Sequence, residues 1–247
     1  MRSPSGVDLR RPRDLGGLIG DALGVYGRHF GAFFLLAAAI VIPVQLVVSG
    51  VGLEQLSSSY EESPSAAETL VPTLVSLLVI APLINGTCIH ALREVAGGSP
   101  LSARRAISAG FEEFAPIFVA IVLAAVGIAL GLLALIVPGV YLAVRWFFVP
   151  QTVVLERARG PEALRRSAEL VHGRWWRTFG IVLVANVVAG LPAFFLVLPF
   201  DALARAADRQ LFALAGAALS EALTGPFVAL LSTLLYYDLR ARRGTEP

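Results

Sequence analysis

The positions of the arginines constrain this chain more than any other feature of its sequence. Long apolar stretches alternate with short polar segments, and the arginines are concentrated in every second polar segment. A basic residue in a short loop beside a membrane-spanning helix is disfavoured on the translocated side. The pattern therefore predicts a chain that crosses a membrane several times and keeps both ends, and alternate connections, on one side.

Six stretches are predicted as transmembrane helices, in a composition that is 56% hydrophobic and 15% charged. About 20 apolar residues are needed to cross the hydrocarbon core. The predicted transmembrane helices are residues 32–53, 69–89, 115–137, 140–155, 178–200 and 222–237, with an interfacial helix over residues 15–30. The expected fold class is an all-α polytopic membrane helix bundle with cytoplasmic interfacial amphipathic helices, a single integral membrane domain over residues 1–247. Pro138-Gly139 is interpreted as the turn of a hairpin that either spans the membrane fully or is re-entrant.

The orientation follows from the arginines, which carry the whole basic signal because the chain has no lysine. Of the 20 arginines, 17 lie in the N-terminal segment, the second and fourth loops and the tail, whereas residues 54–68 hold four glutamates and no basic residue. We expect a multi-pass protein of the plasma membrane with cytoplasmic N- and C-termini, whose basic face meets anionic lipids. Nucleic-acid binding is not expected, because these arginines lie in four membrane-proximal segments without a recognisable binding fold.

The chain is predicted to consist of three similar units, each with an arginine-bearing amphipathic helix, an aromatic-rich junction and a pair of spans. The junction is clear at residues 27–31 and 173–176 and weaker at 111–114. The amphipathic helices are expected to lie in the inner interface, with packing as ordinary protein core as the alternative. Residues 201–219 are expected to form an amphipathic helix on the outer surface. Gly127 and Gly131 predict close helix packing, within the bundle rather than between copies of the chain.

Arg145, Glu221 and Asn186 are the candidate intramembrane polar site. Arg145 is expected about two helical turns, ~10 Å, from the Pro138-Gly139 turn. It either snorkels to the outer headgroups beside Trp146, or contacts an anion or lipid phosphate, or pairs with Glu221 or Asp201. Asn186 belongs to a group of intramembrane polar residues for which hydrogen bonds between helices are favoured over a transport path. The others in this group are Gln45, Asn85, Thr87, His90 and Gln151.

Four arginines of the fourth loop are the candidate contacts to anionic lipid: Arg165, Arg166, Arg174 and Arg177. No catalytic, cofactor-binding or metal-binding residue is predicted. The histidines lie in separate segments without ligand spacing, and nothing assembles a nucleophile, a base and an oxyanion donor. The single cysteine, Cys88, excludes a disulfide within the chain.

Several phrases together resemble a known family. They are residues 138–146 (PGVYLAVRW), Pro150, residues 154–156 (VLE), 163–167 (ALRRS), 173–176 (GRWW), 234–240 (LLYYDLR) and, near the N-terminus, 26–31 (YGRHFG). This resembles the bacterial proteins named for the membrane domain of glycerophosphoryl diester phosphodiesterase, over nearly the whole chain. The resemblance implies a stand-alone membrane module without the catalytic barrel that some members carry. It transfers no catalytic residue, and it implies that Arg145 is a recurring feature of the fold.

The function expected from these observations is a non-catalytic membrane module that contacts lipid or a partner protein. A small transporter or permease-like protein, which uses Arg145 to attract an anionic or lipid-like substrate, is the alternative. A membrane-embedded enzyme acting on lipid is a third reading.

Overall fold

A computed structural model describes residues 13–50, 59–60 and 65–243 of the chain. Within these ranges the chain is helical and contains no strand. The first helices are α1 (Leu15–Arg28), α2 (Phe30–Gly50), α4 (Ala66–Val75), the π-helix η1 (Ser76–Ile80), α5 (Ala81–Ala96) and α6 (Ala103–Glu112). They are followed by α7 (Phe114–Ala134), α8 (Ile136–Arg145), α9 (Val149–Glu156), α10 (Pro161–Val171), α11 (Trp175–Ala207) and α12 (Gln210–Arg243).

In the described part of the chain, six helical stretches are long and apolar enough to cross a membrane. They are Phe30–Val48, Thr69–Ala96, Phe114–Ala134, Ile136–Glu156, Trp175–Ala207 and Gln210–Arg243. Each of the six predicted spans overlaps one of them. The third, residues 115–137, runs past Ala134 into the start of α8, and the end of the first, residues 51–53, lies outside the described residues. The predicted all-α membrane bundle is therefore confirmed, and the chain is a multi-pass membrane protein.

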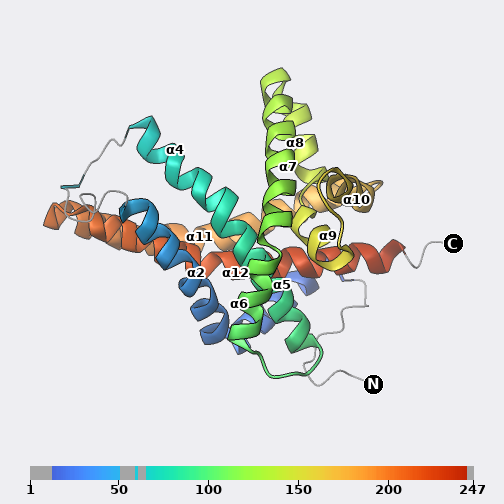
Figure 1. The fold of residues 1–247 in the computed structure, drawn as a ribbon, viewed down its shortest axis with the longest axis horizontal. Coiled ribbons are helices and arrows are strands. Elements are labelled where there is room, and N and C mark those ends of the chain that lie inside the picture. The colour runs from blue at the N-terminus through green and yellow to red at the C-terminus, as the bar shows by residue number, and fades with distance from the viewer. Residues whose placement is uncertain (1–12, 51–58, 61–64, 244–247) are drawn as a thin grey trace.

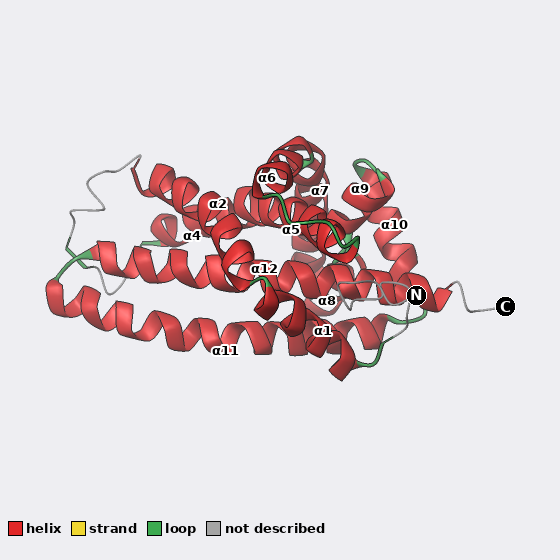
Figure 2. Cartoon of the chain, turned by 90° about the horizontal axis from the view of Figure 1, so that it is seen from below, coloured by secondary structure: helices red, strands yellow, loops and turns green. Residues whose placement is uncertain are grey.

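The helices follow one another as three units, each a short helix and then two spans. The units are α1 with α2 and α4–η1–α5, α6 with α7 and α8–α9, and α10 with α11 and α12. Figure 1 shows the α7–α8 hairpin standing at a steep angle to the α11–α12 hairpin, and Figure 2 shows α11 and α12 side by side along their length. We call the end of the bundle with the α10–α11 connection, the start of α1 and the end of α12 the arginine-rich end.

α12 is the central helix of the bundle, because it packs against α11, α2, α5 and α1. The largest fully buried side chains include Phe33, Phe148 and Tyr236, in one continuous apolar core. Large apolar side chains also lie on the outside, such as Leu133 and Val137 at the tip of the α7–α8 hairpin, which are 84% and 77% exposed. Such a surface is unfavourable in water and suits contact with lipid.

The hairpin between the third and fourth spans does not turn at Pro138-Gly139, as predicted, but at Leu135, the one extended residue between α7 and α8. Pro138 is the third residue of α8, and the first turn of a helix tolerates proline because its N–H would have no partner there. A Cβ on Gly139 would collide with the side chain of Leu132 on α7. This glycine therefore permits close contact between two helices rather than a turn.

The Gly127 and Gly131 stripe packs within the chain, as predicted. A Cβ on Gly131 would lie 3.0 Å from Cα of Gly139, and one on Gly127 would lie 2.5 Å from the ring of Trp146. Both glycines therefore face the α8 segment, where small residues let two helices approach closely.

The prediction of a separate amphipathic helix over residues 201–219 is wrong. Residues 201–207 continue α11, residues 210–219 begin α12, and the reversal takes place at Asp208, which adopts a left-handed backbone with φ 48°. Both halves are apolar enough to continue their helices, so the charges at Asp201 and Arg205 do not end α11.

The apolar face of α1 is covered by protein. Leu18, Ala22 and Val25 are fully buried in the main core, and the Tyr26 hydroxyl donates to the Leu223 carbonyl on α12 at 2.7 Å. The sequence left two possibilities for the apolar face of this helix, contact with the inner membrane interface or packing as protein core. The structure shows packing as protein core. Its polar face stays open, so α1 can still lie at the membrane surface.

Candidate functional site

Arg145 is the last residue of α8, where the fourth span is interrupted before α9 begins at Val149. Ser167 of α10 bridges the interruption: its hydroxyl donates to the Arg145 carbonyl at 2.8 Å and accepts from Phe148 N–H at 3.1 Å. Ser167 is fully buried, and its hydroxyl bonds a backbone carbonyl and a backbone N–H at the break, where the helix offers them no partner of its own. The contact with α10 places Arg145 toward the arginine-rich end of the span.

The position from which snorkelling of Arg145 to the outer headgroups was argued is wrong, and snorkelling itself stays a prediction. The reading counted from a turn at Pro138-Gly139, whereas α8 already begins at Ile136 and carries Arg145 away from the hairpin tip. The Trp146 ring, expected to assist at the surface, packs on Gly127 of α7 instead.

The Arg145 guanidinium lies at the end of an aromatic stack. It is 5.4 Å from the Tyr141 ring centroid, and its Nη1 donates to the Tyr141 hydroxyl at 3.4 Å. Tyr141 stacks on Trp175 with centroids 5.9 Å apart, and Trp175 stacks on Phe179 at 5.2 Å. Trp175 Nε1 also donates to the Tyr141 carbonyl at 3.2 Å, which fixes α8 against the start of α11.

Beside this stack is an open groove of about 470 Å³ whose walls are almost entirely apolar. It is lined by Ile136, Val137, Val140, Tyr141, Trp175, Trp176 and Phe179. Trp176 is 78% exposed, so a large aromatic surface faces outward from the span. We call this the α8–α11 groove. It combines a surface suited to hydrocarbon with a nearby cation, because Arg145 contacts Tyr141 of the groove lining.

Glu221, the second candidate, belongs to a different cluster. Its carboxylate accepts from Gln45 Nε2 of α2 at 2.9 Å and from the hydroxyl of Ser76, the first residue of the π-helix. The ion pair of Arg145 with Glu221 or Asp201, one of the alternatives considered, is not formed among the described residues, where the hydrogen bonds of Arg145 are to Tyr141 and Ser167. Glu221 instead joins three spans through polar side chains.

Asn186, the third candidate, lies on the exposed surface of α11 and donates to the Val182 carbonyl of its own helix at 2.8 Å. Asn85 does the same toward Ala81. The predicted hydrogen bonds between helices are found for Gln45, and for Gln151, which donates to the Ser232 hydroxyl at 2.9 Å. Asn186 therefore belongs to no polar site in the described structure.

Two of the predicted lipid contacts, Arg174 and Arg177, belong to a charge network around Asp238 of α12. Asp238 is fully buried and accepts from Arg13 N–H at 2.6 Å, from Arg177 Nη2 at 2.9 Å and from Arg242 Nε at 3.0 Å. Arg174 Nη2 is close to the Arg242 carbonyl at 3.4 Å. These arginines tie the N-terminal segment, α11 and α12 together, a role that the sequence pattern did not reveal.

The other two, Arg165 and Arg166, lie on the exposed face of α10 beside carboxylates. Arg165 pairs with Glu169 at 2.7 Å, and Arg166 pairs with Glu162 at 3.5 Å. Their charge is thus partly compensated within the helix, although exposed pairs of this kind leave the guanidinium open to further contacts.

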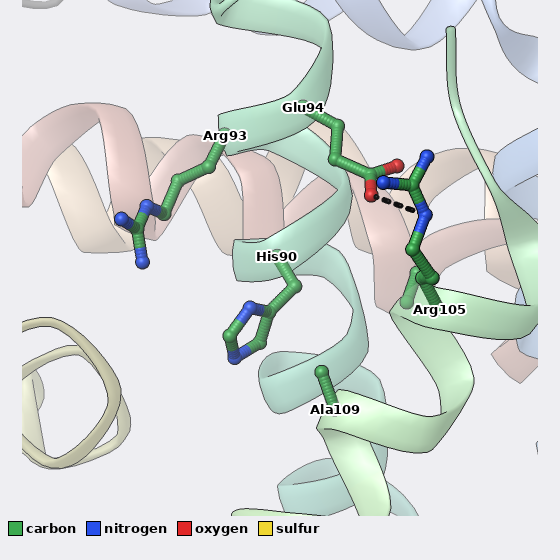
Figure 3. A pocket seen from close by; sticks show the side chains of 6 residues that line it. His90, Arg93, Glu94, Arg105 and Ala109 are labelled. Carbon is green, nitrogen blue, oxygen red and sulfur yellow. Dashed lines mark ion pairs between the residues drawn. The ribbon is translucent and has the colours of Figure 1, made fainter. Parts of the chain in front are cut away.

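A polar pocket that the sequence did not predict lies between α5 and α6, with a volume of about 430 Å³. It is lined by His90, Arg93, Glu94, Arg105, Ala106 and Ala109. In Figure 3, Arg93 lies on one side, Glu94 and its partner Arg105 on the other, and His90 between them. The spacing of His90 and Arg93, three residues apart on one helix face, was the available signal.

Within the described residues, no group of three or more His, Cys, Asp or Glu side chains could hold a metal ion. Cys88 is buried and is a free thiol.

The fold and these clusters define an all-α, multi-pass membrane protein with an arginine-rich end. The chain belongs to the family described as "Domain of unknown function (DUF7847)", whose model matches residues 101–239. The match covers the second and third units of the fold, and thus Arg145, the α8–α11 groove and Asp238. Searches against curated proteins and solved structures gave no match.

Proposed function

We propose that this protein is a non-catalytic membrane module that holds an anionic phospholipid of the inner leaflet in the α8–α11 groove. The proposal includes the orientation inferred from the arginines, in which the arginine-rich end and both termini face the cytoplasm. It also places the protein in the plasma membrane. The sequence resemblance to the membrane domain of glycerophosphoryl diester phosphodiesterase, without its catalytic barrel, is consistent with such a module and remains part of the proposal.

The observation that carries the proposal is the contact of Arg145 with Tyr141, one of the aromatic residues that line the apolar groove. Tyr141, Trp175 and Phe179 offer a continuous stacked surface for an acyl chain, and exposed Trp176 widens it. The guanidinium has no carboxylate within ion-pair distance among the described residues, so a lipid phosphate can supply the missing anion. Tryptophan and tyrosine are also enriched at headgroup level.

The test compares lipid retention by the purified full-length protein in native mass spectrometry, with phosphatidylglycerol and phosphatidylcholine as probes. Arg145→Gln is expected to lower retention of phosphatidylglycerol about fivefold, since one basic residue near an anionic surface contributes ~1 kcal/mol. Trp176→Ala is expected to weaken retention of both lipids, because it removes apolar surface and leaves the charge.

Arg205→Gln is the matched control, because Arg205 lies 5.9 Å from the Tyr60 ring in a similar cation–π contact, far along the chain from the groove. It should leave retention unchanged. If Arg145→Gln and Arg205→Gln retain phosphatidylglycerol equally, the groove is not an anionic-lipid site, and a partner protein becomes the better occupant.

A small transporter is the second candidate, favoured by the Glu221 cluster. An ionisable residue within a span is often functional, and π-helical segments such as η1 are frequent at functional sites. Proteoliposomes loaded with a pH-sensitive dye, under an imposed potassium potential, would detect proton entry. Proton entry in the wild-type protein that is lost in Glu221→Gln supports transport. Equal dye signals from protein-containing and empty liposomes count against it.

A further inference from the structure

We propose that the pocket between α5 and α6 binds a phosphate group through His90 and Arg93. This site is separate from the α8–α11 groove, and the inference does not rest on the proposed lipid contact there. It is argued from the charge of the pocket walls, from an enclosed imidazole nitrogen without a partner, and from the position of the pocket at the end of a span.

The pocket has a rigid base. α5 and α6 run antiparallel, and their backbones touch where a Cβ on Gly86 would lie 3.2 Å from Cα of Gly110. Gly110 is equally tight against Thr87, whose N would lie 3.0 Å from an added Cβ. His90 and Ala106 follow one helical turn further toward the connecting turn, where the helices leave room for the pocket. The lining side chains are therefore held by a fixed helix pair.

The charge of the lining favours an anion. Its only carboxylate, Glu94, is already engaged by Arg105 Nε at 3.5 Å and by Ser102 N–H at 2.8 Å. Nearby Glu113 pairs with Arg159 at 3.0 Å, and Glu112 is exposed at the end of α6. Arg93, in contrast, is exposed and has no carboxylate within ion-pair distance among the described residues. The lining thus carries two guanidinium groups and one carboxylate, and Arg93 is the guanidinium that this carboxylate does not engage.

His90 provides the second, independent observation. Its Nε2 atom is enclosed and has no hydrogen-bond partner in the described part of the chain. A buried polar atom without a partner is rare in folded proteins and indicates a group that the protein alone does not supply. In Figure 3 the imidazole lies between Arg93 on one side and the Glu94–Arg105 pair on the other, and Arg93 is the arginine that no carboxylate of the described residues holds.

The location selects phosphate among anions. His90 and Arg93 occupy the last turns of the span Thr69–Ala96, and the end of a membrane-spanning helix lies at the level of the lipid headgroups. Guanidinium and imidazole N–H groups match the several acceptor oxygens of a phosphate. The phosphate can belong to a lipid headgroup or be free in solution, and the volume of about 430 Å³ admits either.

The experiment has two arms, both on the full-length protein purified in mild detergent. In the first, inorganic phosphate is titrated while thermal stability is followed by tryptophan fluorescence, with chloride at equal ionic strength as reference. In the second, retention of phosphatidic acid and of phosphatidylcholine is compared by native mass spectrometry. Four proteins are measured: wild type, His90→Gln, Arg93→Gln and, as control, Arg104→Gln, which removes an exposed arginine of α6 outside the pocket lining.

We expect His90→Gln and Arg93→Gln each to weaken binding at least about tenfold, as for a lost hydrogen bond to a charged group, while Arg104→Gln behaves as wild type. A response to inorganic phosphate identifies a soluble ligand, and a response to phosphatidic acid alone identifies a headgroup. Because Arg93 is at the surface, Arg93→Gln is expected to fold. It therefore still tests the site if His90→Gln fails to fold. If neither probe separates wild type from Arg93→Gln, the proposal is overturned; the α8–α11 groove is judged separately through Arg145→Gln.

Discussion

Asp238 shows how a single residue organises the arginine-rich end. Its buried carboxylate accepts hydrogen bonds from the N-terminal segment, from α11 and from α12 itself. A buried charge is costly unless it is paired, and here Arg177 and Arg242 reach it while remaining partly exposed. The two arginines therefore stabilise the fold, in addition to any contact with lipid. Not every arginine at this end of the bundle has to be a lipid contact.

Asp238→Asn is expected to lower the free energy of unfolding by about 3 kcal/mol, because it leaves buried donors around an acceptor that has lost its charge. For a chain of this size the loss corresponds to a decrease in Tm of about 6–12 °C, measured in detergent by tryptophan fluorescence. Glu162→Gln is the control: Glu162 is about half exposed, in a pair within α10, and should change stability by less than ~0.5 kcal/mol. Equal effects of both substitutions would contradict a special role of Asp238.

Tyr26 gives a prediction for alkaline pH. Burial raises the pKa of its phenol to about 12, and its neutral hydroxyl donates to the Leu223 carbonyl at 2.7 Å. Because the pKa is about 10 in an unfolded chain, the contribution of Tyr26 to stability is complete below pH ~10 and is lost as the pH rises toward 12. Absorbance at 295 nm should show tyrosine ionisation near pH 12, and Tyr26→Phe should lower that absorbance change by the contribution of one tyrosine. A Tyr26→Phe titration identical to that of wild type would refute the assignment.

At the scale of single elements, the sequence predicted what each helix is but not what it contacts. Hydrophobicity located all six spans, and spacing located the glycine stripe of α7. Gln45 and Asn186 looked equivalent, yet Gln45 meets Glu221 and Asn186 bonds its own helix. An amide within a span can be satisfied in either way, and only the neighbouring helices decide. The pocket at His90 was missed for the same reason, because α6 supplies half of its wall.

Helix contact at the α7–α8 hairpin can be tested with one methyl group. Gly139→Ala would place a Cβ against the Leu132 side chain and 2.8 Å from Leu132 N, so we expect a loss of about 1–3 kcal/mol from overpacking. Gly190→Ala, on α11, adds the same methyl where nothing lies within 4 Å, and it should be neutral or stabilising by up to ~1 kcal/mol. Thermal unfolding of the two variants in the same detergent makes the comparison. Similar stability would mean that the hairpin is looser than described.

For the whole molecule, helix length is the property that sequence reasoning judged least well. α11 and α12 have 33 and 34 residues, ~50 Å at 1.5 Å per residue, against ~30 Å for a hydrocarbon core. The predicted spans of 178–200 and 222–237 were taken from apolar runs of about the length that crosses the hydrocarbon core, and residues 201–219 between them were assigned to the outer surface. Long helices can instead tilt or extend beyond the core. The steep angle between the α7–α8 and α11–α12 hairpins in Figure 1 agrees with strong tilt of at least one of them.

The orientation of the whole chain is the prediction on which the inner-leaflet proposal depends. In a Cys88→Ser background, single cysteines at Arg104 and Arg166 test the arginine-rich segments, and cysteines at Leu135 and Asp208 test the two hairpin reversals. Leu135 is 70% exposed, and Asp208 is exposed at the end of α11, so reagents can reach both. Because arginine-rich loops are retained in the cytoplasm, an impermeant thiol reagent added to intact cells should label positions 135 and 208 and should spare 104 and 166 until the membrane is permeabilised. Labelling of 104 or 166 in intact cells would reverse the assigned topology, and the lipid held by Arg145 would then have to belong to the outer leaflet.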